Sequence, residues 1–171
     1  MNTIVAYPDN LSFSNGKYHH SSDNYKQTNT FSNLNEFDSL SQKDILIYLV
    51  PSSIISSYVF ENNQNLSKQN NLANFISDID SFIVDDISKN EFFIFNENSF
   101  VINKTLYEEL NTMLNTLNCK VLVLPDYFLN RQFGKDTITE FNNKFLFSFK
   151  NGTGSSIAVS YTHLRAHETL L

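Results

Sequence analysis

A glycine-bearing stretch near the end of the chain is the first place where the sequence could do chemistry. Its residues, Asn151, Gly152, Thr153, Gly154 and Ser155, would bring main-chain N–H groups together, and such groups cradle phosphates in nucleotide-binding proteins. The same residue types also turn β-hairpins, because asparagine and glycine tolerate positive φ angles. We interpret the stretch as a hairpin turn and keep a phosphate loop formed by Gly152, Thr153, Gly154 and Ser155 as the alternative.

Carboxylates are densest at Asp78, Asp80, Asp85 and Asp86. Two carboxylates can act as an acid and base pair, and a cluster of them can hold a cation. The spacing argues against a compact site, because Asp78 and Asp85 lie two turns apart on one face of the expected helix while Asp80 points elsewhere. We predict a solvated acidic face, which would speed the encounter with a basic partner.

Histidine and serine patterns indicate no catalytic centre. His163 and His167 have the i, i+4 spacing of a metal-binding helix face, but no third ligand is evident and no glutamate follows the first histidine. Both fall in the segment 159–171, which resembles translated sequencing-adapter DNA and is expected to be non-native. No serine lies in a Gly-x-Ser-x-Gly turn. We therefore expect no catalytic residue, no metal ligand and no cofactor.

The composition is that of a globular, acidic chain. Its 171 residues are 41% hydrophobic, which is enough apolar material for a core of ordinary size. The formal net charge of -6 leaves no basic surface for a phosphate backbone, so nucleic acid is not an expected partner. The single cysteine, Cys119, excludes an internal disulfide and suits a reducing cytoplasm. No apolar run approaches the roughly 20 residues of a membrane span, and no signal peptide is recognisable.

Apolar runs and alternation predict the strands. The continuous runs 44–50 and 120–124 are typical of strands buried on both faces of a sheet. The segment 54–60 is rich in β-branched and aromatic residues and is predicted as an antiparallel neighbour of 44–50. Further strand pairs are expected at 3–7 with 11–18, at 92–95 with 100–102, and at 138–141 with 144–149 around a turn at Asn142 and Asn143.

Spacings of three and four predict the helices. Apolar residues over 72–87 recur as on an amphipathic helix. A second helix is predicted to begin with a capping box formed by Thr105 and Glu108 and to end at Asn118. Short helical turns are expected over 31–40. Strand pairs interleaved with helices predict an α/β sandwich with a mixed sheet at least partly covered by helices.

The order of these elements and three short segments resemble the cytoplasmic domain of the type II secretion system protein L. In that family a buried strand ends in Leu-Val-Pro, as at 49–51, and an acidic helix ends in a Val-Asp-Asp-Leu-like step, as at 84–87. The strand after the long helix ends in Val-Pro-Asp, to which Val-Leu-Pro-Asp at 123–126 is similar. The resemblance covers about residues 44–149.

The resemblance implies an actin-like, RNase H-like α/β fold, incomplete here, with a second lobe that begins near residue 131 of the domain 1–158. It also implies a non-catalytic scaffold at the cytoplasmic face of the inner membrane, which docks the cytoplasmic secretion ATPase to the inner-membrane platform proteins. The membrane would be reached only through a span beyond this segment, and a homodimer stays open. The alternatives are a nucleotide-binding actin-like pilus-assembly protein and an unrelated α/β interaction domain. The partner-binding residues would be Asp78, Asp80, Asp85 and Asp86.

Overall fold

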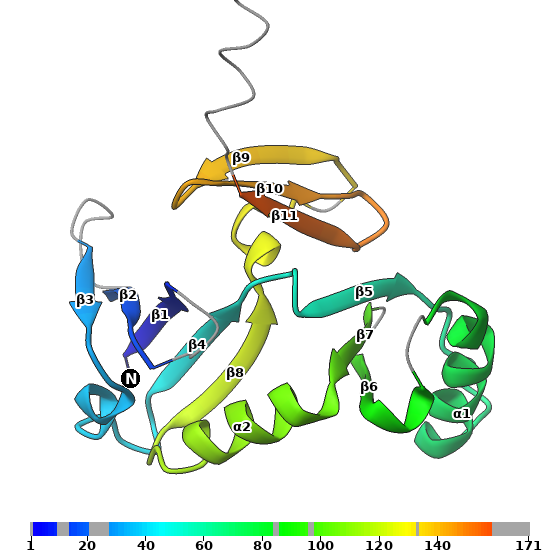
Figure 1. Cartoon of the computed structure of the whole chain (residues 1–171), viewed down its shortest axis with the longest axis horizontal. Helices are drawn as coiled ribbons and strands as arrows, with labels where there is room; N and C mark the ends of the chain where they lie inside the picture. The colour runs from blue at the N-terminus through cyan, green and yellow to red at the C-terminus, as the bar shows by residue number, and fades with distance from the viewer. Residues whose placement is uncertain are drawn as a thin grey trace, which may run out of the picture.

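The computed structural model of the chain describes residues 2–9, 14–20, 28–83, 86–95, 98–132 and 134–158. Asp85, which belongs to the predicted acidic face, lies outside the described residues, and so does the segment 159–171. The described residues form three β-sheets, two α-helices and four short 3-10 helices (Figure 1).

The largest sheet has five strands: β1 (Thr3–Pro8), β2 (Gly16–His20), β3 (Asn29–Phe31), β4 (Ile45–Val50) and β8 (Lys120–Pro125). Their order is β3-β2-β1-β4-β8, in which β1, β4 and β8 run parallel while β2 and β3 are antiparallel to their neighbours. The two strands expected to be buried, β4 and β8, are therefore adjacent. The N-terminal hairpin is confirmed as β1 with β2, although β2 begins and ends later than the predicted 11–18.

A second, three-stranded sheet corrects one predicted pairing. It contains β5 (Ile55–Val59), β6 (Asn90–Phe95) and β7 (Asn98–Asn103) in the order β5-β7-β6, all antiparallel. The hairpin of β6 and β7 was expected. The prediction that 54–60 pairs with 44–50 was wrong, because β1 and β8 occupy both edges of β4 and β5 pairs with β7 instead.

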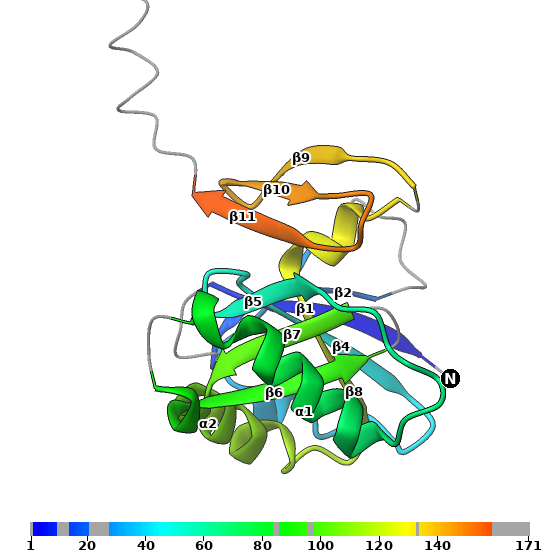
Figure 2. The ribbon, with the colours of Figure 1, turned by 90° about the vertical axis from the view of Figure 1, so that its right-hand side faces the viewer.

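The first helix, α1 (Lys68–Ile79), packs on this second sheet, as Figure 2 shows. It begins earlier than the predicted 72–87, because Ser67 caps it by accepting a hydrogen bond from the Asn70 N–H at 3.2 Å. It also ends earlier, at Ile79, where a 3-10 turn (Asp80–Phe82) takes over. A further 3-10 turn, Ile87–Lys89, leads into β6.

The second helix, α2 (Lys104–Leu114), is capped by a residue that the sequence pattern missed. The Asn103 side chain accepts hydrogen bonds from the N–H groups of Thr105 at 3.0 Å and Leu106 at 3.3 Å. The predicted capping box of Thr105 and Glu108 was wrong, because β7 runs directly into the helix and places asparagine, a strong N-cap residue, at its start. The helix ends at Leu114, four residues before Asn118.

Two apolar cores follow from this arrangement. The main core lies between one face of the five-stranded sheet, α2 and the 3-10 helix Leu34–Phe37, which forms within the expected helical turns. The second core lies between α1 and the second sheet, centred on Phe75. The main core's buried residues are Ile4, Ala6, Phe31, Leu34, Phe37, Leu40, Leu46, Tyr48, Val50, Ile55, Phe100, Leu110, Leu114 and Leu117.

The third sheet is a small antiparallel one that lies across the end of the molecule where β4 and β8 finish (Figures 1 and 2). It contains β9 (Thr137–Phe141), β10 (Lys144–Ser148) and β11 (Gly154–Ala158) in the order β11-β10-β9, and the 3-10 helix Asp126–Asn130 connects it to β8. The turn predicted at Asn142 and Asn143 is confirmed, with φ angles of 48° and 59°.

At the opposite end of the parallel strands, the Asp44 side chain stabilises the start of the main sheet through hydrogen bonds. Its carboxylate accepts hydrogen bonds from the Asn2 N–H at 2.6 Å, the Ser41 N–H at 2.9 Å and the Ser41 hydroxyl at 2.8 Å. These bonds favour the charged form and lower the pKa of Asp44 to about 2.

The Asp44→Asn variant should therefore lose stability in a pH-dependent way. Because the folded-state pKa is depressed, the stabilisation is complete above the ordinary value of 3.8 and disappears as the pH falls through about 2. Thermal melts between pH 2 and 6 should give the wild type a higher Tm than the variant near pH 6, and this difference should disappear near pH 2. The exposed Asp38→Asn serves as the control, and an advantage of equal size at every pH would refute the assignment.

Candidate functional site

Open α/β sheets bind ligands just beyond the carboxyl ends of their parallel strands. A ligand-binding site in this chain is therefore expected beyond the ends of β1, β4 and β8. In this chain each of these ends carries a proline. Pro8 ends β1, Pro51 directly follows β4 and Pro125 ends β8; these are all the prolines of the chain, and all are buried. Since proline has no N–H group, the three positions contribute no main-chain donor to a phosphate.

The small sheet lies against these strand ends and fills the space beyond them. The ring of Phe141 packs edge-on against Tyr7 with centroids 4.7 Å apart, and the Lys17 ammonium donates to the Asn142 side-chain oxygen at 2.8 Å. The cavity that remains between Pro8, Pro51 and Phe141 has a volume of about 10 Å³. That is room for about one water molecule.

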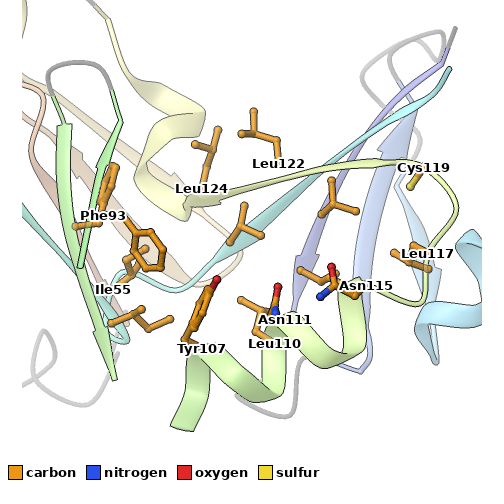
Figure 3. A pocket seen from close by; sticks show the side chains of 15 residues that line it. Ile55, Phe93, Tyr107, Leu110, Asn111, Asn115, Leu117, Cys119, Leu122 and Leu124 are labelled. Carbon is orange, nitrogen blue, oxygen red and sulfur yellow. The ribbon is translucent and has the colours of Figure 1, made fainter. Parts of the chain in front are cut away.

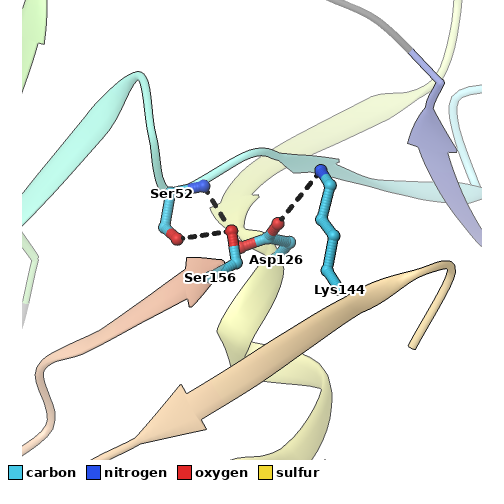
Figure 4. A network of polar contacts seen from close by, with 4 residues as sticks. All are labelled: Ser52, Asp126, Lys144 and Ser156. Carbon is cyan, nitrogen blue, oxygen red and sulfur yellow. Dashed lines mark hydrogen bonds and ion pairs between the residues drawn. The ribbon is translucent and has the colours of Figure 1, made fainter. Parts of the chain in front are cut away.

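A buried carboxylate, Asp126, joins the strand ends to the small sheet (Figure 4). It is only 5% exposed and follows Pro125 directly. The Ser52 N–H donates to its Oδ1 at 3.1 Å, and the Lys144 ammonium lies 3.8 Å from its Oδ2. The Ser52 hydroxyl in turn donates to the hydroxyl of Ser156 at 2.8 Å. The carboxylate is thus paired and hydrogen-bonded, as a buried charge must be, by groups of the chain itself.

The glycine-bearing stretch is placed in the hairpin between β10 and β11. Gly152 takes the turn position with a φ of 90°, and its N–H donates to the Phe149 carbonyl at 2.9 Å. The Thr153 N–H donates to the Asn151 side chain at 3.1 Å, and the Gly154 N–H to the hydroxyl of Ser57 at 3.2 Å. Ser155 pairs with Phe147 inside the sheet. The N–H groups of residues 152–154, which a phosphate would use, are therefore all engaged within the chain.

At Gly154 the small sheet packs tightly against the 3-10 helix Asp126–Asn130. A Cβ atom at this position would lie 2.3 Å from the ring of Tyr127, a side chain with no exposed surface. Next to it, the Arg131 guanidinium donates to the Asn98 side-chain oxygen at 3.1 Å beside Gly152. The sequence pattern did not predict this contact, although Pro125 and Asp126 belong to the segment 123–126 that carries part of the family resemblance.

The predicted acidic face is only partly described. Asp78 on α1 and Asp80 at the start of the following 3-10 turn are exposed, and so is Asp86. Asp86 caps the turn Ile87–Lys89 by accepting the Ser88 N–H at 2.9 Å, and this hydrogen bond lowers the pKa of Asp86. Within the same segment Phe82 is 71% exposed, an unusual position for an aromatic ring. The exposed aromatic side chain of Phe82 therefore lies in the same stretch of sequence as the exposed acidic side chains.

The part of the chain that the structure describes contains neither a metal-binding cluster nor a membrane-spanning helix. No group of three or more His, Cys, Asp or Glu side chains in the described ranges is arranged to hold a metal ion. In the same part of the chain, no helix combines the length and the hydropathy needed to cross a membrane.

No protein-family model matches the chain, and no curated protein matches it by sequence. In fold the chain is similar to a solved structure of the cytoplasmic domain of EpsL, an inner-membrane component of the type II secretion system of Vibrio cholerae. The TM-score is 0.68 and the identity 13%, with 97% of this chain and 75% of that chain covered.

A Bacteroides thetaiotaomicron protein with an actin-like ATPase fold and unknown function matches with a TM-score of 0.46 and 9% identity, over 99% of this chain and 74% of that chain. At these identities the likenesses concern the fold, and the second is too weak to carry an argument. The predicted α/β fold class, with a mixed sheet and flanking helices, is confirmed, and so is the structural resemblance expected from the sequence.

Proposed function

We propose that this chain is a non-catalytic scaffold of a type II protein secretion machinery, which docks the cytoplasmic secretion ATPase to the inner-membrane platform. The observation that carries the proposal is the likeness in fold to the EpsL cytoplasmic domain over 97% of the chain. The chain would lie at the cytoplasmic face of the inner membrane. Residues 1–158 would be the N-terminal part of the cytoplasmic domain, with a second lobe that begins near residue 131.

In the described part of the chain, the lack of space and of main-chain donors at the carboxyl ends of the parallel strands favours a scaffold over a nucleotide-binding protein. A nucleotide in an α/β sheet needs open space and main-chain donors beyond the parallel strands. Here that place has three buried prolines and a cavity of about 10 Å³. Calorimetry with Mg-ATP should accordingly give no heat of binding, whereas saturable heat would favour the nucleotide-binding alternative.

The acidic segment is our candidate for the partner-binding surface, with Asp78, Asp80, Asp85 and Asp86 as its charged residues. Exposed carboxylates would attract a basic partner and speed its encounter. Phe82 supplies what charges alone do not, because a large exposed aromatic ring can be buried in a partner's pocket and provide affinity. We therefore infer that the ATPase contact combines the carboxylates with Phe82.

The proposal is tested by measuring the affinity of the chain for the N-terminal domain of the secretion ATPase encoded with it. Phe82→Ala should weaken binding about tenfold or more, as loss of an aromatic anchor does. The double variant Asp78→Lys, Asp80→Lys should mainly slow association at low salt. The matched control is Glu108→Lys, Glu109→Lys, two exposed carboxylates on α2. Absence of a complex at high micromolar concentration would count against the scaffold, and an equal effect of the control would count against this surface.

A further inference from the structure

An apolar cavity of about 420 Å³ shares no lining residue with the small cavity at the strand ends or with the acidic segment. Figure 3 shows it between β8, α2 and the second sheet, with Tyr107 and Asn111 rising from α2 and Phe93 lying at the second sheet. Its volume falls within the range of about 300 to 1,000 Å³ that is usual for ligand pockets. The cavity therefore has room for several side chains of a partner.

The way β8 lines the cavity shows that the cavity follows an open strand edge. Four successive residues of β8, at 121–124, all contact it, although neighbouring residues of a strand point to opposite faces. In Figure 3, Leu122 and Leu124 project from the face of β8 that is turned away from α2. A cavity can contact residues on both faces of a strand only if it lies along the edge of that strand. β8 is the last strand in the order of its sheet, so among the described residues no strand pairs with that edge.

The cavity is lined without charge but not without polar groups. None of its lining side chains is an Asp, Glu, Lys, Arg or His, and burial raises the pKa of the Cys119 thiol, which therefore stays neutral. Tyr107 and Asn111 on α2 and its C-cap residue Asn115 follow one another at intervals of four residues, and hence share one side of the helix. Two carboxamides can both donate to and accept from a peptide main chain. A charged occupant would lose its hydration here without gaining a counter-charge.

We propose that the edge of β8 and this cavity bind an extended, uncharged segment of a partner protein, which adds as a strand beside β8. The unpaired main-chain groups of the edge would hydrogen-bond the segment, and alternate apolar side chains of the segment would enter the cavity. Contact with residues 121–124 corresponds to about four residues of partner, or roughly 13 Å of strand. A small apolar molecule would use the walls but leave the strand edge unpaired, and the carboxamides would have no main chain to bind.

The test uses the whole chain and a defined set of synthetic peptides. The peptides are six residues long, acetylated and amidated, with Leu, Ile, Val or Phe at positions one, three and five and Thr at the others. We expect the immobilised chain to retain a subset, identified by mass spectrometry and titrated by calorimetry. Methylation of alternate main-chain nitrogens in a retained peptide should abolish its binding, because it removes strand hydrogen bonds.

Two variants place the binding at this edge. Leu122→Lys puts a charge into the cavity at a position that is 38% exposed, and it should weaken a retained peptide at least about tenfold. Its matched control is Leu129→Lys, which is 43% exposed and does not line the cavity. Asn111→Ala, on the exposed side of α2, should weaken binding several-fold. This variant replaces Leu122→Lys as the test if Leu122→Lys does not fold.

Four results would overturn the proposal: no peptide retained, N-methylated peptides bound as well as their parents, equal effects of the two lysine variants, or unchanged binding by Asn111→Ala. A concentration-dependent dimer that Leu122→Lys abolishes would assign the edge to a second copy of the chain instead. The proposal does not depend on the ATPase contact, because the two surfaces share no residue.

Discussion

Gly154→Ala is expected to destabilise the protein by about 3 kcal/mol, which is at the upper end of the usual cost of overpacking and corresponds to a fall in Tm of roughly 6 to 12 °C. The added Cβ would lie 2.3 Å from Cδ2 of Tyr127 and 2.5 Å from the main-chain oxygen of Phe147. Neither neighbour can yield easily, because the Tyr127 ring has no exposed surface and the Phe147 oxygen belongs to the strand paired with β11.

The matched control for this variant is Gly134→Ala. At Gly134 an added Cβ has no atom within 4 Å, so the substitution measures only the strain of its φ angle of 73°. That strain costs about 1 to 2 kcal/mol. Thermal unfolding followed by circular dichroism should rank the two variants clearly, with Gly154→Ala the less stable. Equal shifts would mean that the small sheet moves away freely, and the packing of Gly154 on Tyr127 would not hold it in place.

Phe75→Ala is expected to cost about 3 to 5 kcal/mol, as large-to-small changes in a closed core do. Phe75 has no exposed surface and lies among the rings of Tyr58, Phe60 and Phe92, at centroid distances of 6.2, 5.3 and 6.3 Å. The control is Phe82→Ala, which removes the same side chain from an exposed position and should change stability by less than about 0.5 kcal/mol.

Hydrogen exchange should show where the Phe75→Ala protein loosens. Phe75 belongs to the core between α1 and the second sheet, which is distinct from the core of the five-stranded sheet. Amide protection should therefore fall in α1, β5, β6 and β7 while β1, β4 and β8 keep most of theirs. A uniform loss of protection would show that the two cores unfold as one unit.

Predictions from the sequence succeeded where the signal is local. The apolar runs that became β4 and β8 and the Asn142-Asn143 turn depend on neighbouring residues only. The predictions from the sequence failed where distant segments compete for the same strand edge or helix start. Segment 54–60 was given the wrong neighbour because nothing in its own residues reveals that β1 and β8 already hold both edges of β4. The N-cap was misplaced because Thr105 and Glu108 form a good pattern, whereas Asn103 is recognisable as a cap only once β7 is known to end there.

By itself the sequence determined the class of the protein: an acidic α/β domain with an apolar core, whose glycine stretch suits a hairpin turn. These properties follow from composition and from spacings of two to four residues. Only the tertiary structure decided that the three prolines stand together at the ends of parallel strands, that Asp126 pairs with Lys144, and that β8 is the last strand in the order of its sheet and lines a cavity. Each of these joins residues far apart in the chain, and their meeting depends on strand order, which no local pattern encodes.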